Sequence, residues 1–147
     1  MGGRELSFVD ASIIVAILNE EPGYQEFEKR LNEEKKRLYV SPLVRFEATM
    51  AIARISMESA KGKVDRSAII AEAKAIVDDI IDVLDAKDIS IDAKVGNLAT
   101  EAAIQYGKVA GHKAKLNFGD CFAYAAAKAY RLPLIYKGND FSETDLA

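Results

Sequence analysis

The sequence predicts an α/β protein, built as a three-layer α/β/α sandwich with a central parallel sheet. Short β-prone runs alternate with helical segments along the chain, and no turn signal such as Asn-Gly joins one β run directly to the next. Parallel strands need long crossover connections, which are usually helices. Alternating strands and helices therefore favour a parallel sheet covered by helices.

Composition and length narrow the class further. The chain has 147 residues, of which 50% are hydrophobic and 29% charged, so we expect a single domain over 1–147 with a sizeable core. No apolar run approaches the roughly 20 residues of a membrane span. The start lacks a secretory signal pattern and one cysteine cannot form an internal disulfide, which fits a cytoplasmic protein with no membrane partner. The net charge of −3 gives no whole-chain signal for nucleic acid.

The elements of the first half follow from local signals. Pro22 and Pro42 stand at favoured helix-start positions, and Ser12 lies near the start of the first helix. In order, we expect a strand at 6–10, helices at 12–21 and 22–36, a strand at 37–41 and a helix at 42–57.

The second half carries three side chains that can cap helices, Asp65, Asp92 and Asn117. In order, we expect a helix from Asp65 to about Asp85, a weak strand at 89–91, helices at 93–110 and 117–130, and a strand at 132–137.

Four carboxylates fall at the same edge of the predicted sheet. Asp10 ends the first strand, and Glu47 lies about one turn into the helix that leaves the second strand. Asp120 lies in the first turn of its helix, and Asp140 follows the last strand. Ligands of parallel sheets bind beyond the carboxyl ends of the strands. Each acid alone could merely cap a helix or end a strand, but Glu47 and Asp140 are poorly explained in that way.

Converging carboxylates are the donor set of a hard cation. Mg²⁺ and Mn²⁺ take oxygen ligands, and Mg²⁺ is usually held by one or two carboxylates with waters and phosphates completing its shell. Without a metal, carboxylates this close repel one another, so at least one should have a raised pKa.

A second group of acids serves as a control, since it also shares a helical face. Each of these acids directly follows an apolar residue, and those apolar residues form a stripe along the helix. This pattern is typical of a solvated face beside a buried one. The acids are Asp78, Asp82 and Asp85, and the stripe is Val77, Ile81 and Leu84. We expect them to carry no metal site.

The residues around the four acids resemble the motifs of PIN-domain ribonucleases, in family order and over Phe8 to about Asp145. The resembling motifs are "FVDAS", "FEA", "LNFGDCFAYA" and "YKGNDF". The nearest resemblance is to the VapC-type toxins of bacterial toxin–antitoxin pairs. It implies a PIN fold and a Mg²⁺- or Mn²⁺-dependent endoribonuclease, acting commonly on transfer RNA in this branch.

The resemblance also implies roles for single residues. Asp10, Glu47, Asp120 and Asp140 match the acidic quartet, Ser12 matches a small hydroxyl residue beside the first acid, and Asn117 matches an asparagine before the third. We expect Asp10 and Asp120 to bind the metal most directly. Glu47 and Asp140 would bind it directly or through water, or hold a second ion. Asn139 stands where many members carry a further acid.

Partners follow from the same resemblance. Toxins of this type usually form homodimers and are inhibited by a cognate antitoxin that covers the active-site groove. For RNA itself, the acid-free segment before Asp120 carries Lys113 and Lys115, which we treat as a possible phosphate-contacting rim; an ordinary solvated loop is an equal alternative.

The remaining reactive residues have more ordinary interpretations. Cys121 and His112 are expected to be structural. Tyr124 is expected in the core, with base stacking as the alternative, and Arg54 could pair with a site acid or lie on the surface.

Two other function classes stay open from the sequence. One is a receiver-like phospho-acceptor domain, which also gathers acids and a lysine at strand ends. That class would need its acceptor aspartate at the end of a middle strand, whereas Asp120 opens a helix. The other is a non-catalytic interaction domain that keeps the PIN fold.

Overall fold

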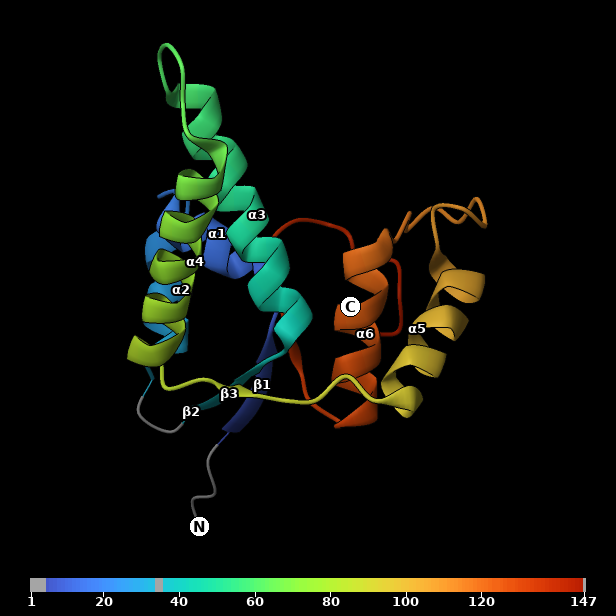
Figure 1. Cartoon of the computed structure of the whole chain (residues 1–147). Helices are drawn as coiled ribbons and strands as arrows, with labels where there is room; N and C mark the ends of the chain where they lie inside the picture. Colours follow the sequence, from blue (N-terminus) through green and yellow to red (C-terminus); the bar gives the residue numbers. More distant parts are fainter. Residues whose placement is uncertain (1–4, 34–35, 147) are drawn as a thin grey trace.

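The computed structural model describes residues 5–33 and 36–146, which form a four-stranded parallel sheet and six α-helices (Figure 1). Their order along the chain is β1 (Glu5–Val9), α1 (Ala11–Leu18), α2 (Tyr24–Leu31), β2 (Lys36–Val40), α3 (Pro42–Ser59), α4 (Arg66–Val83), β3 (Lys87–Asp88), α5 (Ala93–Tyr106), α6 (Phe118–Ala129) and β4 (Leu134–Ile135). The predicted α/β class with a central parallel sheet is confirmed.

Strand β1 lies inside the sheet, whose order is β3-β2-β1-β4 with every pair parallel. Phe8 and Val9 of β1 are fully buried, as are Val40 of β2 and Ile135 of β4. A strand buried on both faces reads as a continuous apolar run, which is how a parallel sheet is recognised. Asp10 follows β1 directly, so it stands at the centre of the carboxyl edge of the sheet.

Two predicted strands are wrong in position or length. The run 89–91 is not a strand, because β3 is Lys87–Asp88; only the Ile89 N–H continues the ladder, donating to the Val40 carbonyl at 2.9 Å. Strand β2 ends there, since Ser41 turns away to cap α3. The run 132–137 shortens to Leu134–Ile135, because the Lys137 N–H donates to Ser12 Oγ at 3.0 Å instead of to a strand.

Three predicted helices are also too long. Helix α1 ends at Leu18 rather than at residue 21, because Glu20 takes a left-handed φ of 47° that stops the helix. Helix α2 begins only after Gly23, whose left-handed φ of 89° precedes the helix, and it ends at Leu31. The predicted residues 34 and 35 lie outside the described part of the chain. Helix α5 ends at Tyr106, because the loop that follows is closed by Leu116, whose N–H donates to the Tyr106 carbonyl at 3.1 Å.

The helix starts agree with the predicted caps. Asp65, Asp92 and Asn117 each accept a hydrogen bond from a backbone N–H in the first turn of α4, α5 and α6. Such caps satisfy N–H groups that have no partner within the helix. At the first helix the cap is Asp10, whose side chain accepts from the Ser12 N–H.

Helix α3, which carries Glu47, contacts three other helices. It packs against α1, α4 and α6, and in Figure 1 the α3–α4 pair and the α5–α6 pair stand on either side of the view. Arg45 of α3 ties this arrangement to the sheet edge: its Nε donates to Asp88 at 2.8 Å and its Nη1 to Asp78 at 2.9 Å. The helix that carries Glu47 is therefore fixed to both α4 and β3.

Two of the three control acids lie on a solvated face, as predicted. Asp82 and Asp85 are exposed, whereas Val77 and Ile81 of the neighbouring stripe are fully buried. Asp78 differs because it is half-buried and paired with Arg45 and Lys74. Within the described residues, no helix has the length and apolar character needed to cross a membrane.

Candidate active site

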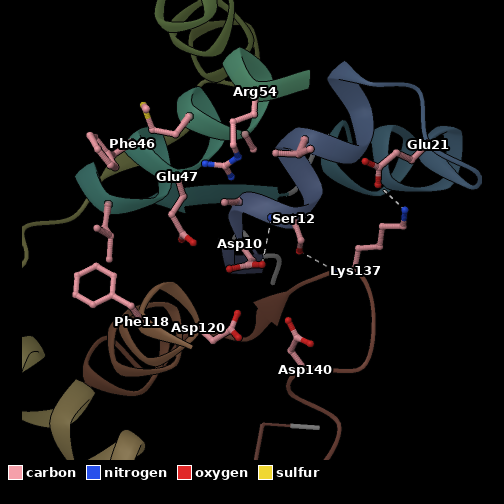
Figure 2. Close-up of a pocket in the computed structure, with 15 residues that line it drawn as sticks. Asp10, Ser12, Glu21, Phe46, Glu47, Arg54, Phe118, Asp120, Lys137 and Asp140 are labelled. Atoms are coloured by element: carbon pink, nitrogen blue, oxygen red, sulfur yellow. Dashed lines mark hydrogen bonds and ion pairs between the residues drawn. The ribbon is translucent and has the colours of Figure 1, made fainter. Parts of the chain in front are cut away.

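The four predicted acids line one cleft at the carboxyl edge of the sheet, with a volume of about 830 Å³. Figure 2 shows Asp10 in the middle, Glu47 reaching down from α3, Asp120 rising from α6, and Asp140 on the segment after β4. Four segments that are distant in sequence therefore supply one carboxylate each. Their convergence follows from the parallel sheet, since the carboxyl ends of its strands meet at one edge.

Asp10 is the most deeply placed of the four, with 6% of its surface exposed. Burial raises the pKa of Asp10. Hydrogen bonds from Ser12 lower it in part, and the nearby charge of Asp140 raises it further. The Ser12 N–H donates to Asp10 Oδ2 at 3.2 Å. Asp10 thus caps α1 and faces the cleft at the same time.

Asp120 is held at the start of α6 by a reciprocal pair of hydrogen bonds with Asn117. The Asp120 N–H donates to Asn117 Oδ1 at 2.9 Å, and the Asn117 N–H donates to Asp120 Oδ2 at 3.1 Å. This is a capping box, with aspartate at the position where glutamate or glutamine is usual. Burial, followed by the charges of Asp140 and Asp10, raises the pKa of Asp120 to about 6 against the opposing hydrogen bond from Asn117.

Glu47 is half-buried, and among the described residues it has neither a hydrogen-bond donor nor a cationic partner. Burial raises its pKa to about 7, and the charges of Asp10 and Asp120 add to the effect. The carboxylate lies where a β-carbon of Gly119 would be, so only glycine leaves room for this position. A half-buried acid without a cation is costly unless a ligand relieves it.

Asp140 is exposed, on a segment that is fixed close to α1. The Lys137 N–H donates to Ser12 Oγ, and the Lys137 amine forms an ion pair with Glu21 at 2.5 Å. That ion pair lowers the pKa of Glu21. Ser12 thus connects the Asp10 turn to the segment that carries Asp140, and Lys137 is already engaged by a carboxylate (Figure 2).

The donor set suits a hard divalent cation held by few direct ligands. All four groups are carboxylates, and three of them have pKa values raised by burial and by mutual repulsion, which a bound cation would reverse. Among the residues that the structure describes, no three His, Cys, Asp or Glu side chains are close enough to enclose an ion. One or two direct carboxylates with water completing the shell therefore fit better than a closed cage.

Several other predicted candidates lie away from this cleft. Lys113 and Lys115 are exposed but do not line it, and Lys113 forms an ion pair with Glu143 at 3.1 Å. Cys121 is buried, and burial together with the charge of Asp120 raises its thiol pKa, so it packs rather than reacts.

His112 and Tyr124 are structural, as predicted. His112 Nδ1 accepts from the Ala114 N–H at 2.9 Å, which shapes the loop before α6. Tyr124 is 6% exposed and its hydroxyl donates to Asp145 Oδ1 at 2.5 Å, so its ring is not free to stack on a base.

The sequence reasoning missed two aromatic residues that line the cleft and one glycine beside Glu47, and it left Arg54 open. Gly119 carries no role in the prediction, because no local pattern shows that its missing β-carbon leaves room for the Glu47 carboxylate. Phe46 and Phe118 line the cleft while mostly exposed. Arg54, the open case, also lines it and has no ion-pair partner among the described residues.

The fold and the acidic cleft define the class of protein. The PIN domain family model matches residues 7–146. The chain belongs to the PIN-domain family.

Within that family, its similarity is to VapC proteins. A VapC ribonuclease of Rhizobium meliloti is 60% identical over 141 residues, covering 96% of this chain and 99% of that protein. Ribonuclease VapC42 of Mycobacterium tuberculosis is 32% identical over 138 residues, covering 94% of this chain and 95% of its own.

Solved structures agree at the level of the fold. VapC20 of Mycobacterium tuberculosis, described as a sarcin-ricin loop cleaving toxin, superposes with a TM-score of 0.67 at 17% identity and covers 94% of this chain and 93% of its own. VapBC2 of Rickettsia felis, solved bound to a DNA fragment from its promoter, gives a TM-score of 0.66 at 15% identity, covering 96% and 94%.

Proposed function

We propose that this chain is a divalent-metal-dependent endoribonuclease toxin, with Asp10, Glu47, Asp120 and Asp140 as its catalytic acids. The observation that carries the proposal is Glu47, a half-buried carboxylate that faces two other acids and forms no ion pair with any residue that the structure describes. Such a group is expected where a bound cation completes the site. The 60% identity to a VapC ribonuclease supports the same function.

The protein side chains divide the work by their positions. Asp10 and Asp120 lie on rigid helix starts and are proposed as the most direct ligands, because the Ser12 N–H and Asn117 fix their carboxylates. Asp120 Oδ1 has no donor among the described residues, which leaves it available. Glu47 and Asp140 are proposed to act directly or through water. When bound, Mg²⁺ or Mn²⁺ supplies a water of lowered pKa and charge relief at the phosphate.

Substrate and partners remain proposals of the same kind. We propose transfer RNA as the substrate. The sarcin-ricin loop is the alternative substrate, because one structural neighbour is described as a toxin that cleaves it. Two structural neighbours are described as complexes of a toxin with its antitoxin or as VapBC, which supports a cognate antitoxin as inhibitor. A homodimer in the cytoplasm is the proposed state of the free protein.

The receiver-like alternative has little support in the site. Asp10 does follow a middle strand, as an acceptor aspartate would, but the Lys137 amine is bound to Glu21. The PIN family match does not support that class. The non-catalytic alternative is decided by activity alone.

The test compares the wild type with Asp120→Asn on labelled transfer RNA and on a sarcin-ricin loop oligonucleotide. Each is incubated with Mg²⁺, Mn²⁺ or a chelator. We expect metal-dependent cutting by the wild type and none by the variant. Asp82→Asn is the matched control, because Asp82 is an exposed acid on α4 outside the cleft. A wild type that cuts neither RNA with either metal would favour the non-catalytic alternative.

A further inference from the structure

One end of the acidic cleft is aromatic. Phe46 of α3 is 63% exposed and Phe118 of α6 is 70% exposed, and both line the cleft. Figure 2 shows them on the same side, beyond Glu47, while Lys137 and Asp140 lie at the opposite end. The cleft therefore runs from an aromatic end, across the carboxylates, to a charged end.

Neither ring is needed by the hydrophobic core. The residues that α3 buries are Val44, Ala48, Thr49, Ile52 and Ala53, so Phe46 lies off the buried stripe. Phe118 is the first residue of α6 and rests against Phe122, with ring centroids 5.2 Å apart and planes inclined by 47°. Large apolar side chains left exposed beside a polar site usually mark a binding surface.

The occupant must suit both ends of the cleft. The carboxylates can bind an anion only through a divalent cation, and the anion that such a cation usually binds is a phosphate. The aromatic end takes a flat apolar group, within the same cleft. A nucleotide joins both features in one unit. A basic peptide would satisfy the acids, but it would also meet Arg54, which lines the cleft and has no ion-pair partner among the described residues.

We propose that Phe46 and Phe118 form a stacking platform for one unpaired nucleobase next to the phosphate held by the acids. The inference rests on the proposed endoribonuclease function and adds a substrate class, a single-stranded or bulged nucleotide. A base inside a duplex is already stacked on its neighbours, so it must leave the helix to reach a phenyl ring. Any base offers a flat face, so the platform selects for exposure of the base rather than for its identity.

The chain has no tryptophan, which permits a direct binding test. Phe118→Trp and Phe46→Trp each place a single fluorophore at the platform. Tyr130→Trp is the matched control, since Tyr130 is an aromatic residue, 43% exposed, beyond the other end of α6 and outside the cleft lining. The probes are a short single-stranded RNA and the same sugar–phosphate chain without bases, with Ca²⁺ replacing Mg²⁺ to slow cutting.

We expect the RNA with bases to quench both platform tryptophans, and the baseless chain and the control position to show no such quenching. Phe118→Ala should weaken binding of the RNA about 5- to 150-fold, the range of one lost base–aromatic stack. Phe118→Leu should weaken it nearly as much, because leucine keeps the apolar surface but not the flat ring.

Three results would overturn the platform. They are equal quenching by the baseless chain, full binding by Phe118→Leu, and quenching by a basic leucine-rich peptide without any by RNA, which would assign the surface to a protein partner. Failure of the parent function looks different. Base-dependent quenching in the tryptophan variants, combined with a wild type that never cuts RNA, would overturn the endoribonuclease and keep the platform. Cutting that is unaffected by Phe118→Ala would do the reverse.

Discussion

The carboxylate of Glu47 occupies the space that a β-carbon of Gly119 would fill. The contact joins α3 to the first turn of α6, one residue before Asp120. Both elements are anchored elsewhere, so the position of the acid depends on the absence of a side chain across the cleft. Gly119 is therefore a positioning residue for Glu47.

Replacing Gly119 with alanine should separate activity from stability. The new β-carbon displaces the Glu47 carboxylate, which is the end of a flexible side chain and can move at little cost to the fold. Alanine favours a helix over glycine by about 0.5–1 kcal/mol, so the free energy of unfolding should stay level or rise. RNA cutting should fall by about tenfold or more, since small misplacements of catalytic groups are expensive. Urea unfolding and single-turnover cleavage measure the two effects.

Gly96→Ala is the control for that experiment. Gly96 lies within α5, and nothing lies within 4 Å of where its β-carbon would be. It should gain the same helix stability with full activity. If Gly119→Ala cuts RNA as fast as Gly96→Ala, the contact with Glu47 has no functional role. Partial recovery in a Gly119→Ala, Glu47→Asp double variant, whose shorter acid avoids the β-carbon, would support it.

The metal-free protein should lose stability as the pH rises from 5 to 8. Folding raises the pKa of Glu47 from 4.5 to about 7 and that of Asp120 from 3.8 to about 6. Between those values the folded state binds more protons than the unfolded state, so the free energy of unfolding falls with rising pH. The two shifts alone would give about 4 kcal/mol over this range. Because Glu47 is only half-buried, solvent screening reduces its share, and we expect a loss of about 2 kcal/mol, measured by urea unfolding in chelator.

Glu47→Gln should flatten that pH dependence and be more stable than the wild type at pH 8, because the amide has no charge to bury. Adding Mg²⁺ at pH 8 should stabilise the wild type by mass action and do so less in the variant. A metal-free wild type that becomes more stable from pH 5 to pH 8 would contradict the assigned crowding of the acids.

Arg54 should contribute more to RNA binding than the lysine pair before α6. Arg54 lines the cleft and has no ion-pair partner among the described residues, whereas Lys113 is paired with Glu143 and neither Lys113 nor Lys115 lines the cleft. Each lost phosphate contact to a single strand lowers the slope of log K against log salt by about 0.7. We therefore expect that reduction from Arg54→Gln, measured by titration at several salt concentrations. The rim hypothesis gains if Lys113→Gln with Lys115→Gln reduces the slope instead.

Arg45→Gln should destabilise the fold by about 1–2 kcal/mol, because it removes the charge-assisted bonds from α3 to Asp78 and Asp88. Lys74→Gln is its control. Lys74 contacts the same Asp78 but its side chain is 70% exposed, so its loss should cost under about 0.5 kcal/mol. Thermal or urea unfolding measures both losses. Similar losses of unfolding free energy in the two variants would show that Arg45 contributes no more to stability than an exposed surface ion pair.

The features that depend on local pattern could be predicted from the amino-acid sequence. The helix caps at Asp65, Asp92 and Asn117 were predicted because capping needs only one side chain and the next few N–H groups. The gathering of the acids was predicted because parallel strands end at one edge, so Asp10 and the segments that follow the other strands must lie close to one another.

The lengths of β3 and β4 were decided only in three dimensions. A strand lasts as long as its neighbour offers free backbone groups, and those are lost where Ser41 caps a helix and where Ser12 takes the Lys137 N–H. Neither the Ser41 cap nor the bond to Ser12 can be predicted from the residues of the runs 89–91 and 132–137.

The finer structure of the cleft was also beyond the sequence. Tyr124 and Phe118 lie in the same helical segment, yet Tyr124 is buried against Asp145 and Phe118 is exposed at the cleft. Exposure depends on what packs against each face of α6, which no local pattern records. The Glu47–Gly119 contact has the same origin: it joins residues 72 positions apart, and only the packing of α3 against α6 brings them together.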